Sequence, residues 1–230
     1  MIRSRVIGTG SYLPVRVVPN DEIAPTLKLS PARIQRLTGI RTRHWAGEHE
    51  ASSDMAIEAG RRALDAADCR PSSIEAIILS TTSPDMMFPS TACLVQRGLG
   101  CKQVGAFDVS ASCSGFLYGL SMAQAMIQSG QVRTCLVVAS EVKSRSLDPQ
   151  DDATALLFGD GAGAVILRGE EDGTPEWRAS VIERYGNTSS ASLPIALDDA
   201  VRGGNISPND LVLLGTFGGG ATWATGLLRW

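Results

Sequence analysis

One cysteine lies where the sequence predicts the turn from a strand into a helix. The stretch 107–116 (FDVSASCSGF) places Cys113 between an expected strand over 106–109 and an expected helix over 115–129. A thiol at a helix N-terminus faces the positive end of the helix dipole and unpaired N–H groups, which favour the nucleophilic thiolate. Its small neighbours, Gly115 among them, would leave room for an acyl carbonyl. Two interpretations stay open: an acyl-accepting nucleophile, and a buried small hydrophobe, which is the usual fate of a free cysteine.

Two further features could take part in such chemistry. Phe217 precedes Gly218, Gly219 and Gly220, whose backbone N–H groups could face an oxyanion or merely let two strands pack closely. Asn187, in the turn GNTS, is either a plain turn residue or a side-chain amide directed at a substrate carbonyl. Neither feature is specific by itself.

The composition excludes several classes of protein. The chain has 230 residues, 21 Lys and Arg against 24 Asp and Glu, and a net charge of −3, so it lacks the basic field of a nucleic-acid binder. It has no secretory signal and no run of roughly 18 apolar residues that could span a bilayer. Its five cysteines show no C-x-x-C spacing and no pairing with histidine typical of a metal site. We expect a cytoplasmic protein that binds neither metal, membrane nor nucleic acid.

Strand-like and helix-like segments alternate along the chain, which indicates an α/β fold with strands buried on both faces. The polar segment 169–177 is the best candidate for a boundary, which predicts two unequal parts, 1–170 and 171–230. The acidic pairs 151–152 and 198–199 are expected on the solvated surface. The expected strands are 5–8, 74–82, 106–109, 134–140, 162–168, 179–182, 211–216 and 222–228, and the expected helices are 54–67, 90–99, 115–129 and 192–202.

Seven strings, spread from the first residues to the last, resemble those of β-ketoacyl-acyl-carrier-protein synthase III, the initiating condensing enzyme of type II fatty acid synthesis. They occur in the order in which the family has them, and as a set they are very specific. They are 8–14 (GTGSYLP), 38–43 (TGIRTR), 88–90 (FPS), 108–116 (DVSASCSGF), 158–163 (FGDGAG), 185–197 (YGNTSSASLPIAL) and 217–223 (FGGGATW).

The resemblance implies a thiolase-like fold, in which two related βαβαβ halves form α-β-α-β-α layers, and a homodimer. Cys113 would take an acyl group from acyl-CoA or an acyl carrier protein, with the backbone N–H groups of Cys113 and Gly219 as the oxyanion hole. A histidine and Asn187 would stabilise the enolate that forms when malonyl-carrier protein decarboxylates. The acyl carrier protein would be the partner, and no cofactor beyond these substrates is implied.

Three residues are implied to contact substrate. Phe88 matches a residue that reaches across the dimer and shapes the partner's acyl pocket, and Phe217 belongs to the glycine string. Arg36 lies beside Leu37, on which an arginine of the family falls when the TGI strings are aligned. Where many members place a Trp and an Arg around adenine, this chain has Arg33 and Asp152. An acyl-carrier-protein donor, or a specialised role in secondary metabolism such as polyketide synthesis, therefore becomes more plausible.

The catalytic histidine of the family has no counterpart. It belongs to a His-x-x-Asn motif between the FGDGAG and GNTS strings, whereas this chain has only His44 and His49. A block on the order of 80 to 90 residues is missing after Ile182, most of what the second half needs for its layers, so 171–230 is expected to be a remnant of that half. The missing block would also carry basic residues that dock the carrier protein.

Two functional interpretations follow from this departure. The first is a condensing enzyme with impaired condensation, and the second is a non-catalytic fragment or dimer-partner subunit. An α/β-hydrolase is disfavoured, because it needs a histidine downstream of its nucleophile and none follows His49.

Overall fold

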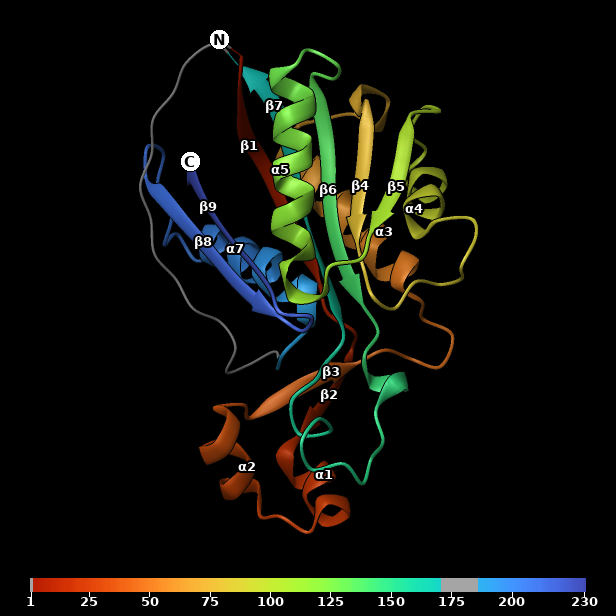
Figure 1. Ribbon diagram of the computed structural model, residues 1–230, viewed down its shortest axis with the longest axis vertical. Coiled ribbons are helices and arrows are strands. Elements are labelled where there is room, and N and C mark those ends of the chain that lie inside the picture. Colours follow the sequence, from red (N-terminus) through yellow and green to blue (C-terminus); the bar gives the residue numbers. More distant parts are fainter. Residues whose placement is uncertain (1, 171–185) are drawn as a thin grey trace.

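The computed structural model describes residues 2–170 and 186–230, and a five-stranded mixed sheet forms its centre (Figure 1). The strand order is β1-β7-β6-β4-β5, with β6, β4 and β5 parallel and β7 antiparallel to both β6 and β1. Every residue of β4 and β6 is buried, as expected for strands covered on both faces. The strands are β1 (Arg3–Tyr12), β4 (Ala76–Ser80), β5 (Gly105–Val109), β6 (Thr134–Glu141) and β7 (Gly161–Glu170).

Two helices, α3 (Ser52–Ala66) and α4 (Thr91–Leu99), cover one face of this sheet. The buried side of α3 consists of small residues, among them Ala56, Ala59 and Ala63, which bring the helix close to β1 and β7. The carboxylate of Asp108 on β5 accepts hydrogen bonds from the first two N–H groups of α4, both at 2.8 Å. An acidic side chain there satisfies unpaired donors at the helix N-terminus.

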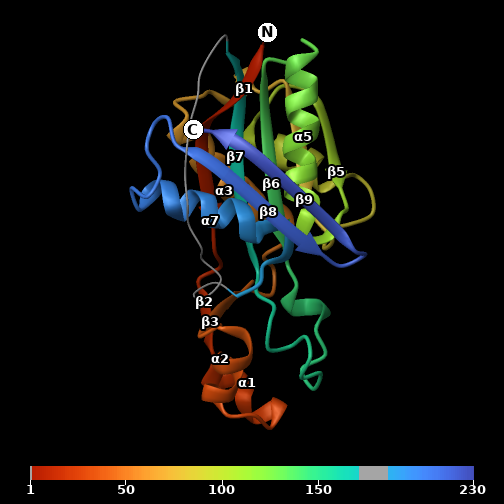
Figure 2. The same cartoon turned by 60° about the vertical axis from the view of Figure 1, so that its left-hand side comes forward.

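The opposite face carries α5 (Gly115–Gln128) and α7 (Ser192–Arg202), and beyond them a hairpin of β8 (Leu211–Gly218) and β9 (Thr222–Arg229) (Figure 2). Asp198 ties α7 to β1, because its buried carboxylate accepts from the hydroxyls of Thr9 (2.8 Å) and Ser11 (2.5 Å). The prediction of a solvated carboxylate is therefore wrong for Asp198. Arg202 also donates to this carboxylate from within α7, but Thr9 and Ser11 lie 189 and 187 residues away in sequence, beyond the reach of local patterns.

The outer face of the β8–β9 hairpin is apolar and exposed. Leu213 pairs with Leu227, and Phe217 pairs with Trp223, and these four side chains are between 63% and 76% exposed. The described residues thus form four layers, namely α3 with α4, the sheet, α5 with α7, and the hairpin. The resemblance implies a fifth layer, and the described residues place none over the outer face of the hairpin.

A small lobe at one end of the molecule was not predicted (Figure 1). Its core packs Val18, Ile34 and Leu156, and it encloses Arg43, which donates to Asn20 Oδ1 (2.9 Å) and the Leu156 carbonyl (3.1 Å). Burial lowers the pKa of Arg43 to about 10. The lobe consists of β2 (Arg16–Pro19), α1 (Asn20–Leu27), α2 (Pro31–Thr38) and β3 (Thr42–Trp45).

The predicted elements are otherwise confirmed with small corrections. The helix over 192–202 has the predicted bounds, whereas the strand predicted over 5–8 extends over Arg3–Tyr12, and the first two residues of the predicted loop 169–177 belong to β7. The strand predicted over 179–182 lies outside the described residues, and the division into 1–170 and 171–230 stays a prediction. Within the described ranges, no helix is long and apolar enough to cross a membrane.

Candidate active site

Cys113 lies at the predicted strand-to-helix turn. The chain leaves β5, passes through a short 3₁₀ helix, η2 (Ser112–Ser114), and continues directly into α5. Ser112 adopts a φ of 47°, which non-glycine residues seldom do, and the next residue, Cys113, is partly exposed. The free thiol is therefore accessible at the start of a helix.

The small residues after Cys113 serve packing rather than substrate access. A Cβ on Gly115 would lie 2.0 Å from Ser80 Oγ on β4, so only glycine lets α5 begin against the sheet. Ser114 is fully buried, and its Oγ accepts a hydrogen bond from Thr216 on β8 at 3.2 Å. The prediction that Gly115 leaves room for an acyl carbonyl is therefore wrong, because Gly115 faces the core.

The glycine turn of the hairpin reaches Cys113. A Cβ on Gly218 would lie 2.9 Å from the Cys113 N atom and 3.1 Å from its Cβ, so the backbones of β8 and η2 are in close contact. Gly219 follows in the turn, where its Cβ position is 3.8 Å from Ser112 Oγ. The structure thus brings Gly218 and Gly219 to the turn that holds Cys113, more than a hundred residues away in sequence.

Asn187 lies on the same side of the site, linked to Cys113 through Ser189. The Oδ1 atom of Asn187 accepts from the Ser189 N–H at 2.8 Å, and Ser189 Oγ is 3.6 Å from Cys113 Sγ. Backbone hydrogen bonds with Leu157 (3.0 Å) and Gly159 (3.1 Å) hold Asn187 beside the string FGDGAG. Sequence reasoning missed Ser189, although it lies in the GNTS turn that indicated Asn187.

The remaining predicted site residues lie on the surface. Phe88, in the loop between β4 and α4, is 87% exposed, and Phe217 is 76% exposed on the outer face of β8, opposite to the side on which Gly218 meets Cys113. Arg36 is exposed on α2 in the small lobe. Their contacts with substrate stay predictions.

The two histidines of the chain lie on β3 and in the turn that follows it. His44 Nδ1 lies 2.6 Å from the Pro14 carbonyl oxygen, and this contact joins β3 to the segment after β1. His49 is exposed. Within the described ranges, no group of three or more His, Cys, Asp and Glu side chains is arranged to hold a metal ion.

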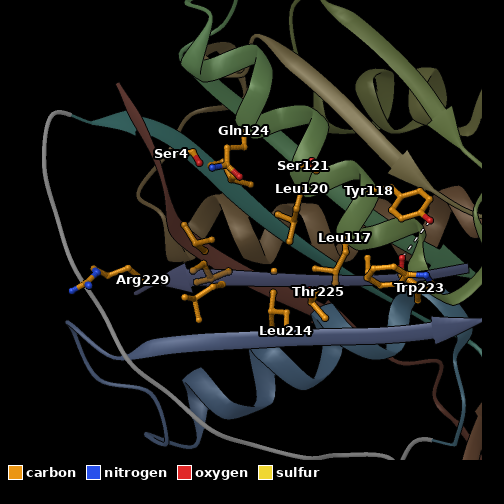
Figure 3. A pocket seen from close by; sticks show the side chains of 16 residues that line it. Ser4, Leu117, Tyr118, Leu120, Ser121, Gln124, Leu214, Trp223, Thr225 and Arg229 are labelled. Atoms are coloured by element: carbon orange, nitrogen blue, oxygen red, sulfur yellow. Dashed lines mark hydrogen bonds between the residues drawn. The ribbon is translucent and has the colours of Figure 1, made fainter. Parts of the chain in front are cut away.

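A cavity of about 370 Å³ lies between α5 and β9, one helical turn beyond the site (Figure 3). Leu117 and Leu120 of α5 face Leu214 and Thr225 of the hairpin across it. Cys113 is not among the residues that line this cavity.

Cys101 and Cys135 are expected to stay unreactive under conditions in which Cys113 is alkylated. Burial raises the pKa of Cys101 to about 11 and that of Cys135 to about 12, so both are neutral thiols at pH values well below these. Iodoacetamide near neutral pH is expected to modify Cys113 and to spare both, and Cys101 should become reactive before Cys135 as the pH rises. Peptide mapping by mass spectrometry measures this, and modification of Cys135 in the folded protein at neutral pH would contradict it.

The family models of synthase III match this chain in two overlapping segments. The model of 3-oxoacyl-[acyl-carrier-protein (ACP)] synthase III matches residues 107–186, and the model of its C-terminal part matches residues 173–230. Two solved structures superpose on nearly the whole chain. The 3-oxoacyl-[acyl-carrier-protein] synthase III of Aquifex aeolicus VF5 gives a TM-score of 0.94 at 33% identity over 99% of this chain and 100% of its own, and that of Pseudomonas aeruginosa PAO1 gives 0.91 at 30% over 99% and 98%.

Curated relatives align with the full length of the chain. A β-ketoacyl-[acyl-carrier-protein] synthase III of Xylella fastidiosa is 35% identical over 320 residues, which cover all of this chain and 99% of the relative. Since this chain has 230 residues, at least 90 of the aligned positions have no residue of it, in line with the expected missing block. The chain therefore belongs to the β-ketoacyl-[acyl-carrier-protein] synthase III family of the thiolase superfamily, the condensing acyltransferases of fatty acid synthesis.

Proposed function

We propose that this chain accepts an acyl group from acyl-CoA or an acyl carrier protein on Cys113. The observation that carries the proposal is the position of this partly exposed thiol, in η2 just before α5 and in contact with the glycine turn. The Cys113 thiolate attacks the thioester carbonyl, a new S–C bond forms, and the C–S bond of the donor breaks. The donor leaves as a thiolate and takes a proton from water.

The oxyanion of the tetrahedral intermediate would be held by backbone N–H groups. The proposed donors are Cys113 and Gly219, and the close contact between Gly218 and the Cys113 backbone supports this pairing. Such donors are fixed by the fold, so they need no rearrangement during the reaction.

Condensation would be weaker than loading. In this step malonyl-carrier protein loses CO₂, and the resulting carbanion attacks the acyl-cysteine and releases the Cys113 thiolate. The enolate would be stabilised by the Asn187 amide without the histidine of the family, and loss of one such donor raises a barrier by roughly 2.7–4 kcal/mol. We therefore propose a loading enzyme with impaired condensation, acting in the cytoplasm.

The proposed assembly is a homodimer that meets the acyl carrier protein. Met87 (97% exposed) and Phe88 (87%) precede α4, whose N-terminus is fixed to the edge strand β5 through Asp108. Exposed apolar side chains beside a free sheet edge are typical of an interface. In such a dimer Phe88 would enter the partner's acyl pocket.

The chain has only His44 and His49 and lacks the histidine motif of the family. This favours one alternative, a non-catalytic partner subunit of a condensing enzyme. Incubation with acyl-CoA or an acyl carrier protein, followed by peptide mass spectrometry, separates the two functions. An acyl adduct on Cys113 supports the enzyme, and its absence on a folded protein, checked by circular dichroism, supports the subunit.

Replacement of Asn187 by alanine is expected to reduce malonyl decarboxylation by about 100-fold and to leave most of the acyl loading, because the amide is proposed to stabilise only the enolate. The Asn187→Ser variant is the control, since a serine hydroxyl can still accept from the Ser189 N–H. It should lose decarboxylation equally and load like the wild type. Equal loss of both activities in the two variants would contradict this division of roles.

A further inference from the structure

The hydroxyl of Ser189 lies against the nucleophile and away from water. Its Oγ is 3.6 Å from Cys113 Sγ, within the range of hydrogen bonds to sulfur, and Ser189 is only 6% exposed. Among the residues that the structure describes, this sulfur is the hydrogen-bond partner found for the hydroxyl. A buried hydroxyl normally has a partner, so the contact with Cys113 is the one that satisfies it.

The backbone around Ser189 is held in a conformation that L residues rarely adopt. Its φ is 53°, and the N–H of Ser189 is fixed by Asn187 Oδ1 at 2.8 Å. On the other side, the hydroxyl of the fully buried Ser190 donates to Glu141 Oε1 at 2.9 Å. A rare conformation persists only where the surroundings determine it, and such residues cluster at functional sites.

Glu141 fixes the position of the segment around Ser190 through hydrogen bonds. Its fully buried carboxylate, at the end of β6, also accepts from the N–H of Thr82 (3.1 Å) and the hydroxyl of Ser83 (2.7 Å), and Lys143 Nζ lies 3.4 Å away. These bonds join the loop after β4, the end of β6 and the 3₁₀ helix η4 (Ser189–Ala191). The Ser189 hydroxyl is therefore presented to Cys113 by a rigid network rather than by a free side chain.

We propose that the Ser189 hydroxyl is a catalytic residue that donates a hydrogen bond to Cys113 Sγ and favours its thiolate. The thiol proton leaves to water, while Ser189 keeps its own proton and shares it with the sulfur. A hydrogen bond to the charged form of a group favours that form. The inference rests on Cys113 being the nucleophile of the proposed function.

Alkylation of Cys113 by iodoacetamide tests the inference without an acyl donor, so its failure is distinguishable from failure of acyl loading. The Ser189→Ala and Ser189→Gly variants both lack the hydroxyl, and glycine is at ease at a φ of 53°. We expect both to alkylate Cys113 about ten-fold more slowly than wild type near neutral pH. Peptide mass spectrometry gives the rate at Cys113.

The control is Ser121→Ala, which removes an exposed hydroxyl from α5 and should leave the rate unchanged at every pH. Wild-type rates in both Ser189 variants would overturn the inference. So would a slow alanine variant beside a fast glycine variant, because backbone conformation and not the hydroxyl would then control the thiol. If the alanine variant does not fold, the glycine variant decides alone, slow alkylation supporting the hydroxyl and a wild-type rate overturning it.

Discussion

Replacement of Cys113 by alanine is expected to abolish acyl loading, by at least about a thousand-fold, from every thioester donor. No other described thiol is joined to the glycine turn and to Ser189, and Cys101 and Cys135 are held as neutral thiols by burial. The fold should survive, because a change from cysteine to alanine at this partly exposed position removes only one sulfur atom. Intact-protein and peptide mass spectrometry after incubation with acyl-CoA or an acyl carrier protein measure the loading.

The matched control is Cys93→Ala. Cys93 is also a free, partly buried cysteine, but it lies on α4, where its sulfur contacts Ser90 Oγ (3.2 Å) and the Ala106 carbonyl (3.6 Å). This variant is expected to load like the wild type. An adduct that persists in Cys113→Ala, or one that disappears in Cys93→Ala, would assign the chemistry to another residue.

Replacement of Gly163 by alanine is expected to lower the free energy of unfolding by about 1–3 kcal/mol, because the added methyl group overpacks the contact between β7 and α7. The added Cβ would lie 2.7 Å from both the Ile195 N atom and the Pro194 Cβ. These atoms belong to the first turn of α7, which Asp198 holds against β1, so the helix cannot move aside freely. Urea unfolding should show a lower midpoint with an unchanged slope.

Gly105→Ala provides the comparison on the same sheet. Gly105 begins β5, and no atom lies within 4 Å of its Cβ position, so this change should alter the free energy of unfolding by less than about 0.5 kcal/mol. Since α7 follows η4, displacement of α7 should also slow acyl loading in Gly163→Ala. Equal stability of the two variants would contradict the packing of α7 on β7.

Local sequence patterns predicted the helices and strands that are long enough to show a repeated apolar pattern. The helix over 192–202 was found at its bounds because an apolar stripe follows a proline in the first turn. The small lobe was missed because β2 and β3 have four residues each, α1 and α2 eight, and such short elements show almost no periodicity. Its core also depends on Leu156, which comes from a distant part of the chain.

The sequence by itself determined that Cys113 lies between a strand and a helix, because both elements are adjacent in the chain, and that the family's histidine motif has no counterpart. Only the tertiary structure decided which groups surround the thiol. Ser189 lies 76 residues from Cys113, and its contact depends on Glu141, Asn187 and a rare backbone conformation. The close approach of Gly218 likewise depends on how the hairpin packs against η2. Such contacts arise from packing between distant segments, which the hydrophobic period of each segment does not encode.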